Sequence, residues 1–426
     1  MGKLKVTRLD RNEGAEYHRT SGFWILALSL IILPTSGFPS DTFEIGGYYK
    51  NFFTIFNSPG PEPIIGAVSN RIRINVSYHP SDLILFSTSY NLSPRIQDTS
   101  LFEEQPTFAT INPFAYRVTD LDSRVYPDED DTVGSFGIFQ NLDLASIWLS
   151  TAFADISIGR QAIVWGSARV FNPTDIIAPF TYNELDTEDR IGVDAIRVRI
   201  PIGMLGELDT GYVFGEDFDF EKSAFFLRSQ FNFAETDTSI LLLGFRENLL
   251  VGFDIARAIG GAGFWLESGY VFADALGDEA NSGDNYLRAS IGLDYSFGGE
   301  TYGLIEYHFS QAGAGNPEDF LTQLNQPAYT DAAVYLLGRH YLAPGLVHQI
   351  TPLINFSSSV LLNLLDPSVF LSSRIEYNIA QDIYVSAGMF IGIGKSTGET
   401  NSSRQKFGSE FGEYPDIYFS SFRIYF

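Results

Sequence analysis

Long runs in which apolar and polar side chains alternate are the feature that most constrains the fold of this chain. Side chains of a β-strand point alternately to its two faces, so a period of two predicts a strand with one apolar and one polar face. In residues 285–297, for example, Leu287 and Ile291 lie on one face, whereas Arg288 and Asp294 lie on the other. The same pattern recurs from residue 43 to the C-terminus, with turn-forming residues between the runs.

The pattern predicts eighteen strands, with sixteen or twenty as open alternatives because strand ends read from one sequence are uncertain by ~2–4 residues. An even number is expected for a closed bacterial barrel. The expected strands span residues 43–56, 64–79, 82–93, 138–150, 154–166, 190–201, 207–218, 223–234, 237–246, 248–258, 262–273, 285–297, 301–310, 337–349, 352–365, 368–379, 382–394 and 414–426.

The segments between the expected strands alternate in length. Short turns, such as residues 79–82 and 151–154, follow the even-numbered strands. Several odd-numbered strands are followed by long segments, near residues 94–137, 167–189, 274–284, 311–336 and 395–413. This layout predicts an all-β fold: a single transmembrane antiparallel up-and-down β-barrel with short periplasmic turns and long extracellular loops.

Residues 1–40 have the features of a signal peptide. Basic residues precede an apolar run from Phe23 to Leu33, and small and turn-forming residues follow to about Ser40. A retained membrane anchor is the alternative, but the run is shorter than the roughly 20 residues that a transmembrane helix needs. The barrel with its loops is therefore expected to occupy residues 41–426.

A soluble β-sandwich is the main alternative to a membrane barrel, since its strands alternate as well. Eighteen strands would require two or three such domains, and the sequence shows no linker that would divide the chain. Aromatic residues also gather near strand ends, as at Tyr48, Phe52, Tyr270 and Tyr425. Such clusters are typical of the aromatic girdles of membrane barrels.

Composition excludes several kinds of chemistry. The chain has no cysteine, which excludes thiol catalysis, disulfides and cysteine-ligated metals, and its net charge of -25 argues against a nucleic-acid partner. No cofactor is expected. The acidic stretch at residues 127–131 could bind a divalent cation through oxygen ligands, but a solvated outer loop is the simpler interpretation.

The last nine residues, "YFSSFRIYF", place Phe422, Ile424 and Phe426 on one face of a strand. This run resembles the C-terminal signal of Gram-negative outer-membrane proteins, which the barrel-assembly machinery recognises. The resemblance implies a member of the outer-membrane porin superfamily, located in the outer membrane of a Gram-negative bacterium and surrounded by outer-membrane lipid. Its expected partner in transport is a small hydrophilic solute.

Residues 159–180, "GRQAIVWGSARVFNPTDIIAPF", are similar to the alginate-export type of porin and its uncharacterised relatives. That resemblance suggests sugar acids or oligosaccharides as solutes. The turn-forming residues Asn172, Pro173, Thr174 and Asp175 belong to this stretch. The loop that contains them either folds into the barrel as a constriction or caps the outer rim, and both alternatives are open.

Charged residues on the polar faces are expected to line the pore. The predicted basic residues are Lys50, Arg71, Arg73, Arg197, Arg199, Arg228, Arg246, Arg288, Arg374 and Arg423. The predicted acidic residues are Asp254, Glu267, Asp294, Glu306 and Glu376. Basic residues of the last, first and second strands would face acidic residues of the tenth to thirteenth strands. Such walls would create a transverse field across the lumen, unless local neighbours neutralise the charges.

Arg160 does not fit the alternation. Strict parity with Ile156 and Ile158 would turn its side chain toward lipid, where an arginine at mid-depth costs ~2–4 kcal/mol. We therefore expect a β-bulge that turns Arg160 inward.

Together these features predict an outer-membrane porin-like channel for passive diffusion or export of small hydrophilic solutes, and no enzymatic activity. A barrel enzyme of the lipase or protease type is one alternative. It would need a nucleophile, a base and an orienting group within hydrogen-bond reach, whereas His308 is two residues from Glu306 and from Ser310, which places them ~6–7 Å apart on one strand face. An adhesin or structural barrel plugged by its loops is the other alternative.

Overall fold

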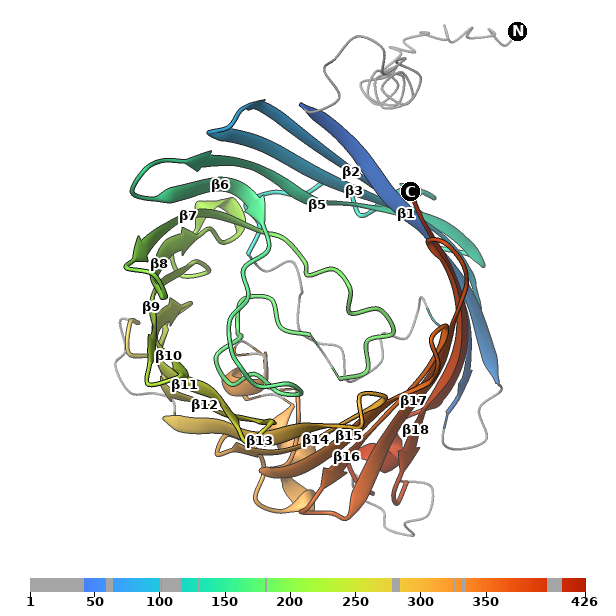
Figure 1. The fold of residues 1–426 in the computed structure, drawn as a ribbon. Coiled ribbons are helices and arrows are strands. Elements are labelled where there is room, and N and C mark those ends of the chain that lie inside the picture. The colour runs from blue at the N-terminus through green and yellow to red at the C-terminus, as the bar shows by residue number, and fades with distance from the viewer. Residues whose placement is uncertain are drawn as a thin grey trace, which may run out of the picture.

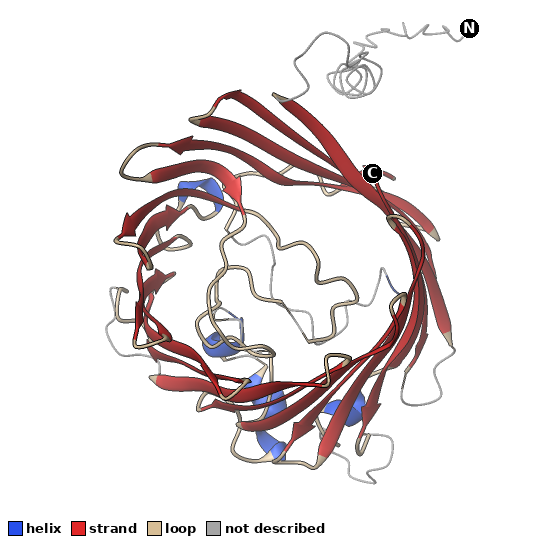
Figure 2. Ribbon diagram, in the orientation of Figure 1, coloured by secondary structure: helices blue, strands red, loops and turns tan. Residues whose placement is uncertain are grey.

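The computed structural model describes residues 42–58, 64–99, 101, 116–128, 130–180, 182–277, 284–324, 326–330, 332, 335–396 and 408–426. In this part of the chain, antiparallel strands form one closed ring around a lumen, and β1 pairs with β19 to close it (Figure 1). Coil segments lie inside the ring, as the tan trace in Figure 2 shows. The expected signal peptide, residues 1–40, lies outside the described residues.

Eighteen strands form the wall. They are β1 (Phe43–Asn57), β2 (Ile65–Ser81), β3 (Ile84–Gln97), β5 (Phe136–Ser150), β6 (Asp155–Gln161), β7 (Val193–Ile202), β8 (Gly206–Val213), β9 (Ala224–Phe233), β10 (Thr236–Phe245), β11 (Asn248–Ile259), β12 (Ala262–Phe272), β13 (Tyr286–Phe297), β14 (Thr301–Ser310), β15 (His340–Thr351), β16 (Ile354–Asn363), β17 (Ser368–Ala380), β18 (Ile383–Ile393) and β19 (Asp416–Tyr425). The predicted barrel of eighteen strands is therefore confirmed.

One further strand, β4 (Arg124–Tyr126), pairs only with β5. It lies beside Ile138 and Phe139, whereas β6 pairs with β5 only from Ala145 to Ser150. β6 is shorter than the expected residues 154–166 because the chain leaves the wall after Gln161. β4 thus covers part of the β5 edge that β6 does not reach.

The two rims differ as predicted. Two- or three-residue turns join β7 to β8, β9 to β10 and β11 to β12, whereas the longest connections lie at the opposite rim. Short helices occur there, namely η2 (Glu216–Phe218), η3 (Pro317–Asp319), α3 (Phe320–Gln323), α4 (Pro327–Thr330) and η5 (Phe411–Glu413). No helix among the described residues is long and apolar enough to span a membrane.

The barrel is polar inside and apolar outside. On β13, Arg288 and Ser290 are buried on the inner face, whereas Ile291 and Leu293 are 42% and 49% exposed on the outer face. Exposed apolar side chains recur on the outer faces of the other strands. An apolar outer surface is unfavourable in water and favourable in contact with lipid. The alternation along each strand is therefore explained by lipid outside the barrel and polar surroundings inside it.

Arg160 is buried and paired without a bulge. β6 keeps a continuous register with both β5 and β7, so the expectation of a bulge was wrong. Instead Gly159 has φ +111°, a conformation that favours glycine. Beyond it the Arg160 guanidinium is buried and lies 2.9 Å from both Asp120 and Asp194. Its charge is therefore paired rather than exposed on the apolar surface.

The C-terminal end of β19 is tied to β1. The Gly47 N–H donates to the Phe426 carbonyl at 2.8 Å, and the Phe426 N–H donates to the Gly47 carbonyl at 3.0 Å. The Phe426 ring is 65% exposed, and alternation places it on the outer face with Phe422 and Ile424. The aromatic side chain is thus presented on the surface of the seam where the barrel closes.

Replacing Phe426 by Asp is expected to lower the amount of folded barrel in the outer membrane, because it removes the aromatic end of the run that resembles the assembly signal. Phe426→Tyr, which keeps an aromatic ring, is the matched control and should assemble normally. Heat-modifiable gel migration of the protein from isolated outer membranes measures the folded fraction. Equal folded fractions for the two variants would show that barrel assembly does not depend on an aromatic residue at position 426.

Candidate functional site: the lumen and its inward loop

The main internal feature of the lumen is the segment of residues 162–192, which connects β6 to β7 and which we call the inward loop. The described part of this segment leaves the wall and runs through the interior of the ring (Figures 1 and 2). It contains the four candidate constriction residues Asn172, Pro173, Thr174 and Asp175. Thr174 bonds Glu267 on β12 and the Pro173 carbonyl lies next to Gly269 on that strand, whereas Asn172 and Asp175 bond other residues of the inward loop.

Glu267 on β12 holds one part of the inward loop. Its carboxylate is 0% exposed and accepts hydrogen bonds from the N–H groups of Ser167, Ala168 and Thr174, each at 2.9 Å, and from the Thr174 hydroxyl at 2.7 Å. Gly166 permits this approach, because a Cβ there would lie 2.6 Å from a carboxylate oxygen. Four donors thus enclose one carboxylate, and such charge-assisted bonds are stronger than neutral ones.

Glu306 on β14 holds the next residues in the same way. It accepts hydrogen bonds from the N–H groups of Arg169 and Phe171 at 2.8 Å and of Val170 at 3.3 Å. The indole N–H of Trp265 donates to the same carboxylate at 2.8 Å. Two residues predicted to be acidic pore-lining groups are therefore acceptors for the backbone of the inward loop.

Three of the acidic residues in the far part of the inward loop, Asp186, Glu188 and Asp189, contact the wall, and we call them the acidic arm. The Lys50 ammonium on β1 lies 2.9 Å from Asp186 and 2.6 Å from Glu188, and the Arg71 guanidinium on β2 lies 3.0 Å from Asp186. Lys50 is fully buried by these contacts. The predicted basic residues of the first two strands thus meet the acidic arm.

Asp189 completes this contact. The Tyr48 hydroxyl donates to it at 2.5 Å, and the Arg73 guanidinium lies 3.6 Å away. Tyr425 on β19 donates to Glu188 at 2.6 Å. The inward loop is therefore held at both ends, by acidic residues of β12 and β14 and by basic residues of β1 and β2. These pairings favour local neutralisation over a transverse field across an open lumen.

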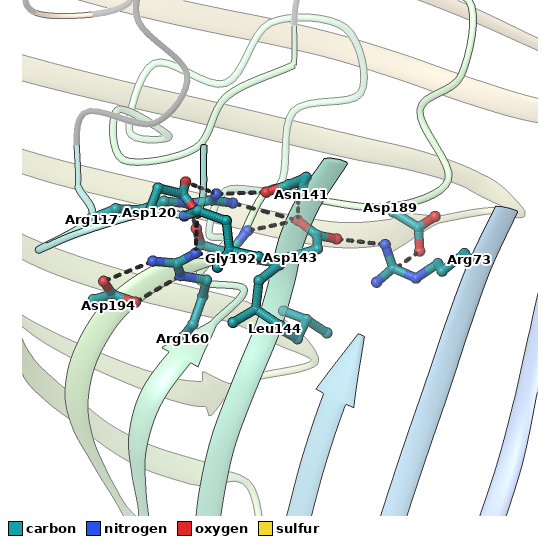
Figure 3. A network of polar contacts seen from close by, with 12 residues as sticks. Arg73, Arg117, Asp120, Asn141, Asp143, Leu144, Arg160, Asp189, Gly192 and Asp194 are labelled. Carbon is teal, nitrogen blue, oxygen red and sulfur yellow. Dashed lines mark hydrogen bonds and ion pairs between the residues drawn. The ribbon is translucent and has the colours of Figure 1, made fainter. Parts of the chain in front are cut away.

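A second polar network fixes the place where the inward loop rejoins the wall (Figure 3). Its charges alternate in sign through the ion pairs Arg73–Asp143, Arg117–Asp143, Arg117–Asp120, Arg160–Asp120 and Arg160–Asp194. The Gly192 carbonyl accepts a hydrogen bond from Arg117 at 2.9 Å, and its N–H donates to Asp143 at 3.4 Å. Sequence reasoning missed this network, because Arg117 and Asp120 lie in a segment expected to be an outer loop.

The other predicted pore-lining residues of β7 and β9 pair with their neighbours. Arg197 lies 2.7 Å from Asp209, and Arg228 donates to Gln230 at 2.9 Å. Arg199 lies 3.8 Å from an acidic residue on β6. These side chains lie on the inner wall but away from the inward loop's two anchors.

The remaining predicted residues have mixed surroundings. Arg423 pairs with Glu376, Asp254 accepts the hydroxyl of a serine on β10, and Asp294 accepts the Tyr302 hydroxyl at 2.8 Å. Arg374 forms no ion pair with any described residue. The expectation for Arg246 was wrong, because it lies at the turn between β10 and β11 rather than on a strand face.

A cavity of about 430 Å³ lies between the inward loop and strands β13 to β17. Arg169, Arg190 and Arg288 line it, together with Asp175 and several aromatic rings. Burial raises the pKa of Asp175 to about 6, while Arg190 and Arg288 act in the opposite direction. Arg190 lies 3.0 Å from Asp175. Arg169 lies 3.7 Å from Asp294, so Arg288 is the arginine of this cavity that forms no ion pair in the described part of the chain, and it gives the cavity an excess of positive charge.

The buried pair Ser290 and His308 does not have the geometry of a hydrolase. The histidine Nδ1 lies 2.8 Å from the serine hydroxyl, but that hydroxyl donates its proton to the Phe171 carbonyl at 2.7 Å. The imidazole therefore donates to Ser290 and cannot accept its proton, as a general base must. Both side chains are buried beneath the inward loop.

No family model and no curated protein matches the sequence. Solved structures of outer-membrane porins match it over almost its whole length. OccAB1 of Acinetobacter baumannii is 8% identical with a TM-score of 0.52, and the match covers 92% of this chain and 97% of that one. A BenF-like porin of Pseudomonas fluorescens is 9% identical with a TM-score of 0.54, covering 91% and 99%.

OpdK of Pseudomonas aeruginosa, whose structure was determined with vanillate, is 8% identical with a TM-score of 0.52, covering 92% of this chain and all of that one. At such low identities the likeness concerns the fold. This chain therefore has the eighteen-stranded transmembrane barrel fold of outer-membrane porins.

Proposed function

We propose that this chain is a passive diffusion channel for small hydrophilic solutes in the outer membrane of a Gram-negative bacterium. The observation that carries the proposal is the inward loop, which is bonded to β12 and β14 and to β1 and β2 inside a barrel with the porin fold and has an arginine-lined cavity of about 430 Å³ beside it. A barrel of this strand number encloses an aqueous channel unless it is plugged. The loop narrows such a channel and places charged side chains along the path.

The narrower part of the proposal concerns the solute. The excess of arginine in the cavity favours anions, and the solved OpdK structure contains vanillate. The resemblance of residues 159–180 to alginate-export porins points to sugar acids, although the solved structures that match are of the Occ, Opd and BenF-like types. Small carboxylates, with sugar acids among them, are therefore the proposed solute class.

The same proposal includes the partners inferred from the sequence, namely outer-membrane lipid and the barrel-assembly machinery. A hydrolytic function is less favoured because the proton of Ser290 is directed to a loop carbonyl rather than to His308. A structural barrel without a path is the remaining alternative.

Single-channel recording in a planar lipid bilayer separates these functions. We expect the purified, folded protein to give discrete conducting steps in potassium chloride, and to give a zero-current potential of anion selectivity in a salt gradient. A silent bilayer with correctly folded protein would exclude the channel, and hydrolysis of a lipid or peptide ester by that protein would support the enzyme instead.

A further inference from the structure

A second hollow continues the arginine-lined cavity along the wall. It has a volume of about 150 Å³ and is lined by residues of β14, β15, β16 and β17. Leu304, Gly345 and Ser359 line both hollows, so the two are contiguous. The second hollow also contacts Tyr302, the second residue of β14. This hollow therefore lies nearer to the rim of short turns than the arginine-lined cavity does.

The lining of the second hollow contains no charged side chain. Ser359 on β16 and Ser372 on β17 are directly opposite each other in the sheet, and both line the hollow. Neither hydroxyl has a hydrogen-bond partner among the described residues, and neither side chain is buried. Two unpaired hydroxyl groups thus face the lumen next to a cavity that favours anions.

Gly345 leaves room for a solute in front of this serine pair. It lies directly opposite Ser359 on the neighbouring strand. A Cβ at this position would lie 3.1 Å from the Leu304 side chain, so any larger residue would fill the junction of the two hollows. The two hollows together can hold the two ends of one solute.

Resting on the proposed function, we propose that Ser359 and Ser372 form a second subsite that selects solutes carrying hydroxyl groups. The carboxylate of such a solute lies in the arginine-lined cavity, and its hydroxyl groups exchange hydrogen bonds with the serine pair. Serine hydroxyls both donate and accept, as do the hydroxyl groups of a sugar ring. The solute class is therefore a hydroxylated carboxylate rather than a purely apolar one.

The test compares two anions of similar size and equal charge, D-glucuronate and cyclohexanecarboxylate, as blockers of the single-channel chloride current. The wild-type channel is expected to be blocked at lower concentration by glucuronate. In the variant Ser359→Ala/Ser372→Ala, block by glucuronate should weaken by roughly three- to tenfold, the factor that corresponds to the loss of one or two hydrogen bonds. Block by cyclohexanecarboxylate should be unchanged.

The chain offers a matched control on the same two strands. Ser358 and Ser373 are also opposite each other, and Ser358 borders the second hollow, but alternation places both side chains on the outer face, where their hydroxyls bond each other at 2.8 Å instead of facing the hollow. Ser358→Ala/Ser373→Ala should leave block by both anions as in the wild type. Equal block by the two anions in the wild type, or an unchanged preference in the inner-pair variant, would overturn the inference while the channel itself still conducts.

Discussion

The single-channel conductance is expected to rise when Glu267 and Glu306 are both replaced by glutamine, because the first half of the inward loop is then released. Each carboxylate accepts four hydrogen bonds, seven of the eight from the loop itself and one from Trp265. A glutamine amide has one acceptor oxygen, and its NH₂ group faces N–H donors. Several loop N–H groups would therefore lose their acceptors.

The magnitude follows from the cost of those unpaired groups. A buried N–H without an acceptor costs ~1–3 kcal/mol, and each ~1.4 kcal/mol changes an equilibrium tenfold. Loss of even one such bond at each glutamate should raise the population of the released loop by more than tenfold. Longer and larger conducting states are therefore expected in bilayer recordings, together with faster proteolysis of residues 162–192.

Asp254→Asn is the matched control for this variant. Asp254 lies directly opposite Glu267 on the neighbouring strand. Its replacement by asparagine removes one negative charge from the same wall. The Asp254 carboxylate bonds Ser239 rather than the inward loop. The control should change ion selectivity slightly and leave the conductance unchanged, and an unchanged conductance in the folded double glutamine variant would show that the loop does not narrow the path.

The strands could be predicted from the sequence because their pattern is local. Lipid on one side and the lumen on the other require alternation within each strand, and a shift of one residue would place every polar side chain in lipid. β6 shows the limit of this reasoning. The run continues to Trp165, but Ile163 and Trp165 are buried inside the barrel. Alternation shows that one face of a run is apolar. It does not show whether that face contacts lipid or packs against other side chains inside the barrel.

The polar face of most charged strand residues was predictable, with Arg160 and Arg246 as exceptions, whereas the partners of these residues were not. Parity places Lys50 and Glu267 on the inner wall, but the groups that meet them come from the inward loop, about a hundred or more residues away. The alternation of side chains within a strand contains no information on contacts between distant segments. The turn chemistry of Asn172 and Pro173 was equally compatible with a loop inside the barrel and a loop on its rim, so only the three-dimensional contacts decide its place.

Replacing the acidic arm by amides is expected to shift the channel strongly toward anions. The variant Asp186→Asn/Glu188→Gln/Asp189→Asn keeps the size of each side chain and removes three negative charges from the lumen. The basic groups of β1 and β2 that these residues now neutralise would then act on ions in the lumen. The zero-current potential in a potassium chloride gradient measures the change.

The shift should depend on ionic strength. Lys50 and Arg71 lose their principal ion pairs in this variant, while Arg73 keeps its contact with Asp143 at 2.5 Å. Two basic groups would therefore remain without full neutralisation. Salt screens charges over ~30 Å at 0.01 M but over ~10 Å at 0.1 M, so the potential should move further in the dilute gradient.

A variant with the same change in net charge tests whether position matters. Asp128→Asn/Asp130→Asn/Asp131→Asn removes three acidic groups from a stretch that follows β4 and whose described residues are largely exposed. Its zero-current potential should stay close to that of the wild type. If the two triple variants shift the potential equally, the effect reflects net charge alone; if the acidic-arm variant folds and shows no shift at low salt, the acidic arm does not border the ion path.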